Sequence, residues 1–136
     1  MDPAGDIENE RNERPMKKRI LLIDDQPDFV ELITLRLEAN QYEVMTASDG
    51  QEGFDKALSE QPDLILLDIM MPQKNGFEVL PQLKQHAQAR LIPVIMLTAK
   101  AETRSMSKSQ KLGATDYLIK PVDTKELLAA IQRYVS

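Results

Sequence analysis

The chain has 136 residues, 42% of them hydrophobic, and a formal net charge of −5. This length fits one domain with a single core, and the negative charge argues against a broad nucleic-acid-binding surface. No cysteine is present, which excludes disulfides and thiolate metal sites. No apolar run approaches the ~20 residues of a membrane span, and the start lacks the features of a secretory signal, so we expect a cytoplasmic domain.

The first 16 residues show no apolar periodicity. They carry five acidic residues and two arginines, a net charge of −3. Such a segment cannot bury enough apolar surface to offset the entropy of ordering. We therefore predict a disordered acidic tail over residues 1–16, with binding to a partner as the alternative, and one domain over residues 17–136.

Short apolar runs alternate with segments of helical pattern along the rest of the chain. The predicted strands are residues 20–23, 42–47, 64–68, 92–97 and 117–119. The predicted helices are residues 28–40, 51–60, a segment that follows Gly76, 101–112 and 123–135. The strands lack polar alternation, which is typical of a parallel sheet with helices on both faces. This pattern predicts an α/β domain with one doubly wound sheet and right-handed crossovers.

Several local signals set the expected helix ends. Asn40 is a candidate left-handed stop for the first helix, and Gly113 is a natural cap for the fourth. Pro81 falls inside the third helix, so we expect a distorted first turn or a late start. Asp123, with Glu126 three residues later, resembles a capping box at the start of the last helix.

Reactive or charged residues stand where four of the predicted strands end. The strand before Asp68 is a continuous apolar run, and an unpaired carboxylate inside it would cost several kcal/mol, so Asp68 belongs at its carboxyl end. Asp24 and Asp25 end the first strand, Thr98 the fourth and Lys120 the fifth. Because parallel strands share one carboxyl edge, these five side chains are candidates for a single cluster.

Each of these residues also has an ordinary structural interpretation. Asp24 and Asp25 can cap the helix that follows, a strand-end Thr98 can bond to backbone, and Lys120 can be a solvated surface lysine. Three carboxylates on one edge repel each other, however, and hard oxygen ligands at this density suit Mg²⁺. A carboxylate beside Mg²⁺, a lysine and a hydroxyl is suited to accept a phosphoryl group and form an acyl phosphate.

Four motifs, in this order and spacing, resemble the CheY-like receiver domains of two-component response regulators. They are I-L-L-I-D-D, L-I-L-L-D-I-M-M-P with Gly76 eight residues after Asp68, V-I-M-L-T-A and G-A-T-D-Y-L-I-K-P. The resemblance runs from about Lys18 to Val135. It implies a flavodoxin-like fold with strand order 2-1-3-4-5 and five helices. It also implies a sensor histidine kinase or phosphotransfer protein as phosphodonor, and a downstream protein target that the sequence does not name.

The resemblance also implies roles for individual residues. Asp68 is then the phosphoacceptor, Asp25 binds Mg²⁺ directly, Asp24 binds it mainly through water, and the backbone carbonyl of Met70 is a further ligand. Mg²⁺ is the only cofactor implied.

The remaining implied roles concern the switch. Thr98 contacts the phosphoryl group, Lys120 pairs with it, and the Lys120–Pro121 bond is cis. Tyr117 turns inward when Thr98 moves. The readout surface is then formed by the helix after Thr98, the strand of Tyr117 and the last helix.

Two other classes of function stay open. A Mg²⁺-dependent aspartyl phosphatase typically has a second acid two residues after its nucleophile, where this chain has Met70. A receiver-like scaffold that takes no phosphate is the other alternative, and the complete set of site residues argues against it. The segment 127–131, Leu-Leu-Ala-Ala-Ile, lacks the arginine typical of the winged-helix branch, so we expect a monomer or weak dimer. The negative charge and the short apolar runs predict no direct nucleic-acid or membrane contacts.

Overall fold

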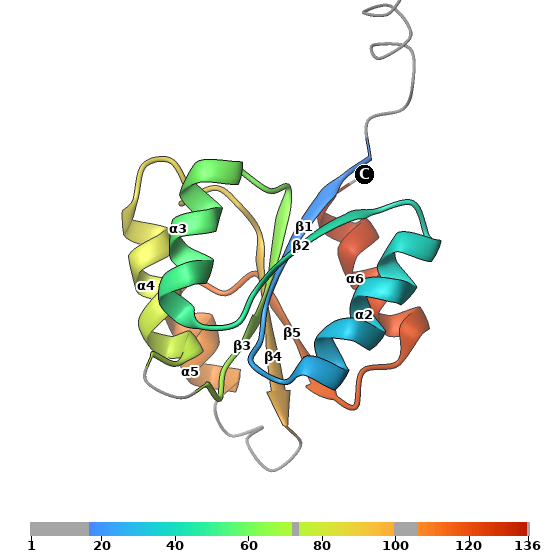
Figure 1. Cartoon of the computed structure of the whole chain (residues 1–136). Coiled ribbons are helices and arrows are strands. Elements are labelled where there is room, and N and C mark those ends of the chain that lie inside the picture. Colours follow the sequence, from blue (N-terminus) through green and yellow to red (C-terminus); the bar gives the residue numbers. More distant parts are fainter. Residues whose placement is uncertain (1–16, 72–73, 100–105, 136) are drawn as a thin grey trace, which may run out of the picture.

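The computed structural model describes residues 17–71, 74–99 and 106–135, which form one α/β domain (Figure 1). The strands are β1 (Arg19–Ile23), β2 (Glu43–Ala47), β3 (Leu64–Asp68), β4 (Val94–Ala99) and β5 (Asp116–Lys120). The helices are α2 (Pro27–Ala39), α3 (Gly50–Glu60), α4 (Gly76–Gln85), α5 (Met106–Lys111) and α6 (Thr124–Tyr134). All strand pairs are parallel, in the order β2-β1-β3-β4-β5. The predicted fold class and strand order are confirmed.

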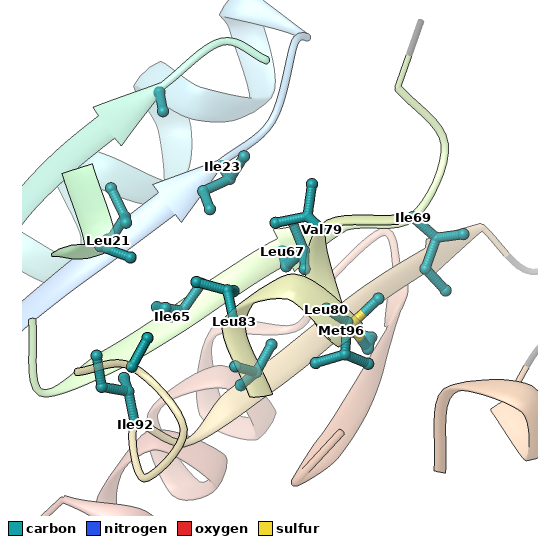
Figure 2. Packing of buried hydrophobic residues seen from close by; sticks show 14 of the residues in the cluster. Leu21, Ile23, Ile65, Leu67, Ile69, Val79, Leu80, Leu83, Ile92 and Met96 are labelled. Carbon is teal, nitrogen blue, oxygen red and sulfur yellow. The ribbon is translucent and has the colours of Figure 1, made fainter. Parts of the chain in front are cut away.

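Helices cover both faces of the sheet. Figure 1 shows α3, α4 and α5 on one face and α2 and α6 on the other. Alternate residues of each strand therefore enter different cores: Ile65 and Leu67 of β3 pack under α3 and α4 (Figure 2), whereas Leu64 and Leu66 face α2 and α6. All five residues of β3 are buried, which explains why its sequence is a continuous apolar run.

The first helix ends differently from the prediction. Asn40 has φ −109°, and the left-handed residue is Gln41, at φ 70°. The Asn40 side chain donates to the carbonyl of Arg36, and its backbone N–H donates to the carbonyl of Leu37. Because these bonds already satisfy carbonyls of the last turn, the chain reverses one residue later than expected.

The expected late start of the third helix is wrong. Helix α4 begins at Gly76, and a reciprocal capping box joins Asn75 and Glu78. The N–H of Val79 donates to the carbonyl of Asn75 and closes the first turn. The capping box fixes the start of the helix before Pro81 is reached. Pro81 lies deeper in the helix, and because it has no N–H, one hydrogen bond to the carbonyl of Phe77 is missing.

Smaller boundary differences also have local causes. Strand β4 begins at Val94 rather than at residue 92, because Ile92 still donates to Ala89 in the preceding turn and Pro93 has no N–H. Gly113 has φ +102°, as expected of a left-handed cap, and the Asp123 side chain accepts from the N–H of Glu126. The predicted tail over residues 1–16 and the first half of the predicted helix over residues 101–112 lie outside the described residues. Among the described residues, no helix has both the length and the apolar character needed to cross a membrane.

Candidate functional site

Strand alternation brings three of the predicted site residues to the same side of the sheet. Asp24 follows β1, Asp68 ends β3 and Lys120 ends β5, and all three continue the strand positions that face α2 and α6. Thr98, in β4, continues the positions that face the opposite layer. The carboxyl edge therefore holds an acidic group with a lysine on one side and a hydroxyl on the other.

Asp24 is the most buried charged residue at this edge, with 1% of its surface exposed. One carboxylate oxygen lies 2.7 Å from Nζ of Lys120, and the other accepts a 2.9 Å hydrogen bond from the N–H of Gln26. Gln26 precedes α2 as its N-cap, and no side-chain cap bond is formed there. The alternative in which Asp24 and Asp25 cap α2 is therefore wrong. The Asp24 carboxylate accepts the N–H of Gln26, the residue before the helix, and not an N–H of the first turn.

Asp68 is held in an electrostatic environment that disfavours its charge. It is 4% exposed, it lies 3.5 Å from Nζ of Lys120, and it accepts a long 3.4 Å bond from the N–H of Met70. Burial, followed by the negative charge of Asp24, raises the pKa of Asp68 to about 6, although Lys120 and the N–H of Met70 act in the opposite direction. The negative charge of Asp68 is thus incompletely neutralised by the protein.

The donor set at this edge fits a divalent cation. Carboxylate oxygens of Asp24, Asp25 and Asp68 all lie within 4.8 Å of one another. Asp25 is half-buried and forms no hydrogen bond or ion pair with another described residue. Three carboxylates face the single ammonium of Lys120 within the described part of the site, so a hard cation such as Mg²⁺ would balance the excess charge. Met70, whose N–H donates to Asp68, is 58% exposed.

Thr98 and Tyr117 lie near this edge without completing the cluster. Thr98 is fully buried, and its hydroxyl donates to the carbonyl of Ala99 at 3.2 Å. Tyr117 is half-buried against the core under α3 and α4. The Lys120–Pro121 bond is cis, as expected.

Two residues that contact Lys120 are absent from the predicted site. Oε1 of Gln26 lies 3.2 Å from Nζ of Lys120, and the ring centroid of Phe29 lies 4.2 Å from it. The sequence pattern gives no sign of these contacts beyond the position of both residues at the start of the helix that follows Asp24 and Asp25.

Gly76 closes the loop that leads away from Asp68. A Cβ atom at this position would lie 2.7 Å from the backbone oxygen of Asp68 and 2.9 Å from Cα of Ile69. The N–H of Gly76 also donates to the carbonyl of Ile69 at 2.9 Å. Only glycine lets the backbone approach this closely.

We expect Gly76→Ala to lower the free energy of unfolding by roughly 1–3 kcal/mol, because backbone rather than a flexible side chain must move. Urea denaturation measures this change, and Ser59→Ala on the exposed face of α3 is the control. A loss no larger than that of the control would show that the loop accommodates a methyl group.

Comparison with known proteins agrees with this geometry. The family model of the response regulator receiver domain matches residues 20–132. The fold and the acidic edge define a phosphoacceptor regulatory domain, and the chain belongs to the response regulator receiver family.

Curated relatives and solved structures show the same likeness. The chain is 44% identical over 117 residues to the alkaline phosphatase synthesis transcriptional regulatory protein PhoP of Bacillus subtilis, covering 86% of this chain and 48% of PhoP. It is 42% identical over 114 residues to the DNA-binding dual master transcriptional regulator RpaA of Synechocystis, covering 84% and 47%. The chain thus spans about half the length of these relatives.

Two solved structures are informative. Chemotaxis protein CheY4 of Vibrio cholerae superposes with a TM-score of 0.83 at 31% identity, covering 88% of this chain and all of CheY4 (100%). The receiver domain of the sensor histidine kinase PA1611 from Pseudomonas aeruginosa gives a TM-score of 0.81 at 29% identity, covering 88% and 98%. That domain was solved with a magnesium ion coordinated in its active-site cleft.

Proposed function

We propose that Asp68 accepts a phosphoryl group from the phosphohistidine of a sensor histidine kinase or phosphotransfer protein. The single observation that carries this proposal is the acidic group at the carboxyl edge, in which Asp68 lies among Asp24, Asp25 and the ammonium of Lys120. An oxygen of Asp68 attacks phosphorus, the P–N bond breaks, and the imidazole leaves with the bonding electrons and is protonated. The product is an acyl phosphate on Asp68.

The residues around Asp68 have complementary tasks in this transfer. Asp25 would hold Mg²⁺ directly, Asp24 mainly through water, and the carbonyl of Met70 would add a ligand. When bound there, Mg²⁺ supplies positive charge to the phosphoryl oxygens. Lys120 supplies a second positive charge, which the 3.5 Å approach to Asp68 supports. The magnesium-bound receiver domain of PA1611 supports the choice of metal.

Phosphorylation would then act as a switch through Thr98 and Tyr117. The phosphoryl group adds about −1.5 to −2 charges, and the Thr98 hydroxyl would exchange the Ala99 carbonyl for a phosphoryl oxygen. This movement frees space for Tyr117, which is now half-buried, to turn inward. Moving a switch from about 1% to 99% active takes roughly 5.5 kcal/mol, which charge-assisted hydrogen bonds and metal coordination can provide.

The switch would be read by a downstream protein on the surface formed by α5, β5 and α6. The exposed residue Ile119 and a recess of about 550 Å³ between β5 and α6, lined in part by Tyr117 and Arg133, support this choice of surface. The domain acts as a monomer or weak dimer in this proposal, since residues 127–131 of α6 lack the arginine expected there of the winged-helix branch.

The test is labelling by a small-molecule phosphodonor with and without Mg²⁺. Wild type should incorporate phosphate only with Mg²⁺, and Asp68→Asn should lose essentially all label because the amide cannot act as the nucleophile. Asp55→Asn, an exposed change on α3, is the matched control and should label like wild type.

The alternatives give different results in this test. If wild type takes no label although Mg²⁺ is shown to bind, the proposal is contradicted and the scaffold is favoured. Steady turnover of the donor without lasting label would favour the phosphatase.

A further inference from the structure

Two residues at the start of α2 hold the side chain of Lys120, although they lie more than 90 residues earlier in the chain. Nζ of Lys120 is 3.2 Å from Oε1 of Gln26 and 4.2 Å from the ring centroid of Phe29. Gln26 is the N-cap of α2, with extended backbone, and Phe29 lies in its first turn. The two residues therefore form a cradle for a cation that belongs to the last strand.

The side chain of Gln26 serves Lys120 rather than its own helix. Its position, the N-cap, is usually taken by Ser, Thr, Asp or Asn, whose side chains accept an N–H of the first turn. Gln26 forms no such bond, and its oxygen accepts from Lys120 instead. Its backbone N–H donates to Asp24. One residue thus contacts both members of the 2.7 Å ion pair between Lys120 and Asp24.

The ring of Phe29 supplies a second restraint on the ammonium. A cation over an aromatic face is attracted by the ring quadrupole, more strongly when water is excluded. The Lys120 side chain is only 16% exposed, so this contact is largely shielded from water. By comparison, Lys74 lies 5.9 Å from the ring centroid of Phe54, a longer contact than that between Lys120 and Phe29.

We infer that Gln26 and Phe29 are positioning residues that hold the ammonium of Lys120 between Asp24 and Asp68 before a phosphoryl group arrives. The ammonium is closer to Asp24 than to Asp68, at 2.7 Å against 3.5 Å. A lysine side chain has four rotatable bonds, and without the cradle only the two carboxylates restrain it, with the shorter ion pair drawing it toward Asp24 and away from Asp68. A charge that is already in place needs no reorganisation during the reaction. The inference rests on the proposed function and adds to it the residues that prepare Lys120.

The first test compares Phe29→Leu and Phe29→Tyr, with acetyl phosphate as donor at saturating Mg²⁺. Leucine removes the aromatic face and should slow phosphorylation roughly three- to tenfold, whereas tyrosine keeps the face and should restore the rate. NMR of the Lys120 ε-methylene provides a readout that does not depend on activity. Its proton signals should be shielded in wild type and in Phe29→Tyr, and should move downfield in Phe29→Leu.

The second test uses Gln26→Ser. Serine is too short to reach Lys120 but is a good N-cap, so the melting temperature should rise while the phosphorylation rate falls. A merely structural role for Gln26 would not move stability and rate in opposite directions. Phe54→Leu is the matched control: it removes a half-buried ring of α3, so it should lower the melting temperature and leave the rate unchanged.

The outcomes separate this inference from the proposed function. Wild type that takes no label would overturn the phosphoacceptor role, and this inference with it. If wild type is labelled, a Phe29→Leu rate equal to wild type, or Lys120 signals that do not move, would overturn the inference alone. A rate that falls equally in Phe54→Leu would also overturn it, because the effect would then follow stability. Slowing confined to Phe29→Leu and Gln26→Ser would support it.

Discussion

Asp68→Asn should raise the free energy of unfolding of the Mg²⁺-free protein by about 3 kcal/mol at pH 8. In the folded protein, burial and the charge of Asp24 raise the pKa of Asp68 to about 6 from an ordinary value of 3.8. A tenfold change in an acid dissociation constant corresponds to about 1.4 kcal/mol between the two protonation states. Asparagine resembles the protonated carboxyl and removes the cost of ionising it in this site.

The pH dependence follows from the direction in which the pKa moves. Because the pKa is raised on folding, the folded state binds the Asp68 proton more tightly, and wild type loses stability as pH rises from 3.8 to about 6. The loss is fully present above that window. The difference between Asp68→Asn and wild type should therefore be small near pH 4, grow through pH 5 and 6, and level off by pH 7–8. Urea denaturation in chelator-containing buffer at each pH measures it.

Asp55→Asn is the control for this experiment, because Asp55 is exposed on α3. It should change stability by less than about 0.5 kcal/mol at any pH. Adding Mg²⁺ should narrow the gap between Asp68→Asn and wild type, since a cation that binds the three carboxylates stabilises wild type more. A wild-type protein that is as stable as Asp68→Asn at pH 8 without Mg²⁺ would contradict the raised pKa.

The sequence was sufficient to predict the fold and the acidic group because both depend on patterns within a few residues. The apolar run from Leu64 to Leu67 is long enough to define a buried strand, and Asp68 cannot lie inside one unpaired. Once the strands are parallel, their carboxyl ends share an edge. The proximity of Asp24, Asp25 and Asp68 then follows without knowledge of any side-chain conformation.

The parts that the sequence did not predict depend on competition between hydrogen bonds or on the placement of one element relative to another. The Asn40 side chain bonds to the carbonyl of Arg36, which moves the left-handed residue to Gln41. The cradle of Gln26 and Phe29 depends on how α2 is placed over the sheet relative to Lys120, a tertiary relation that no local pattern encodes. Asp68 illustrates the difference. A local sequence pattern predicts its position at the end of the strand, whereas its pKa depends on burial and on neighbours such as Asp24 and Lys120.

Lys120→Met should lower the free energy of unfolding by roughly 3–5 kcal/mol at pH 8 without Mg²⁺, because it leaves buried carboxylates without their cation. The side chains of Asp24 and Asp68 are 0% and 6% exposed, so water cannot replace the ammonium. Methionine keeps the apolar stem that packs near Phe29, which confines the change mainly to charge. The loss should shrink below about pH 6, where Asp68 becomes protonated, and it should shrink in millimolar Mg²⁺.

Lys125→Met, an exposed change in the first turn of α6, is the matched control and should cost less than about 0.5 kcal/mol. In the Lys120→Met background, Asp68→Asn should raise the free energy of unfolding by more than the about 3 kcal/mol that it adds to wild type, because there it removes one of the two carboxylates that have lost their cation. Additive effects in this cycle would mean that Lys120 neutralises Asp24 alone. The 3.5 Å approach to Asp68 would then contribute nothing before phosphorylation, and the preparation of the site would depend on the metal.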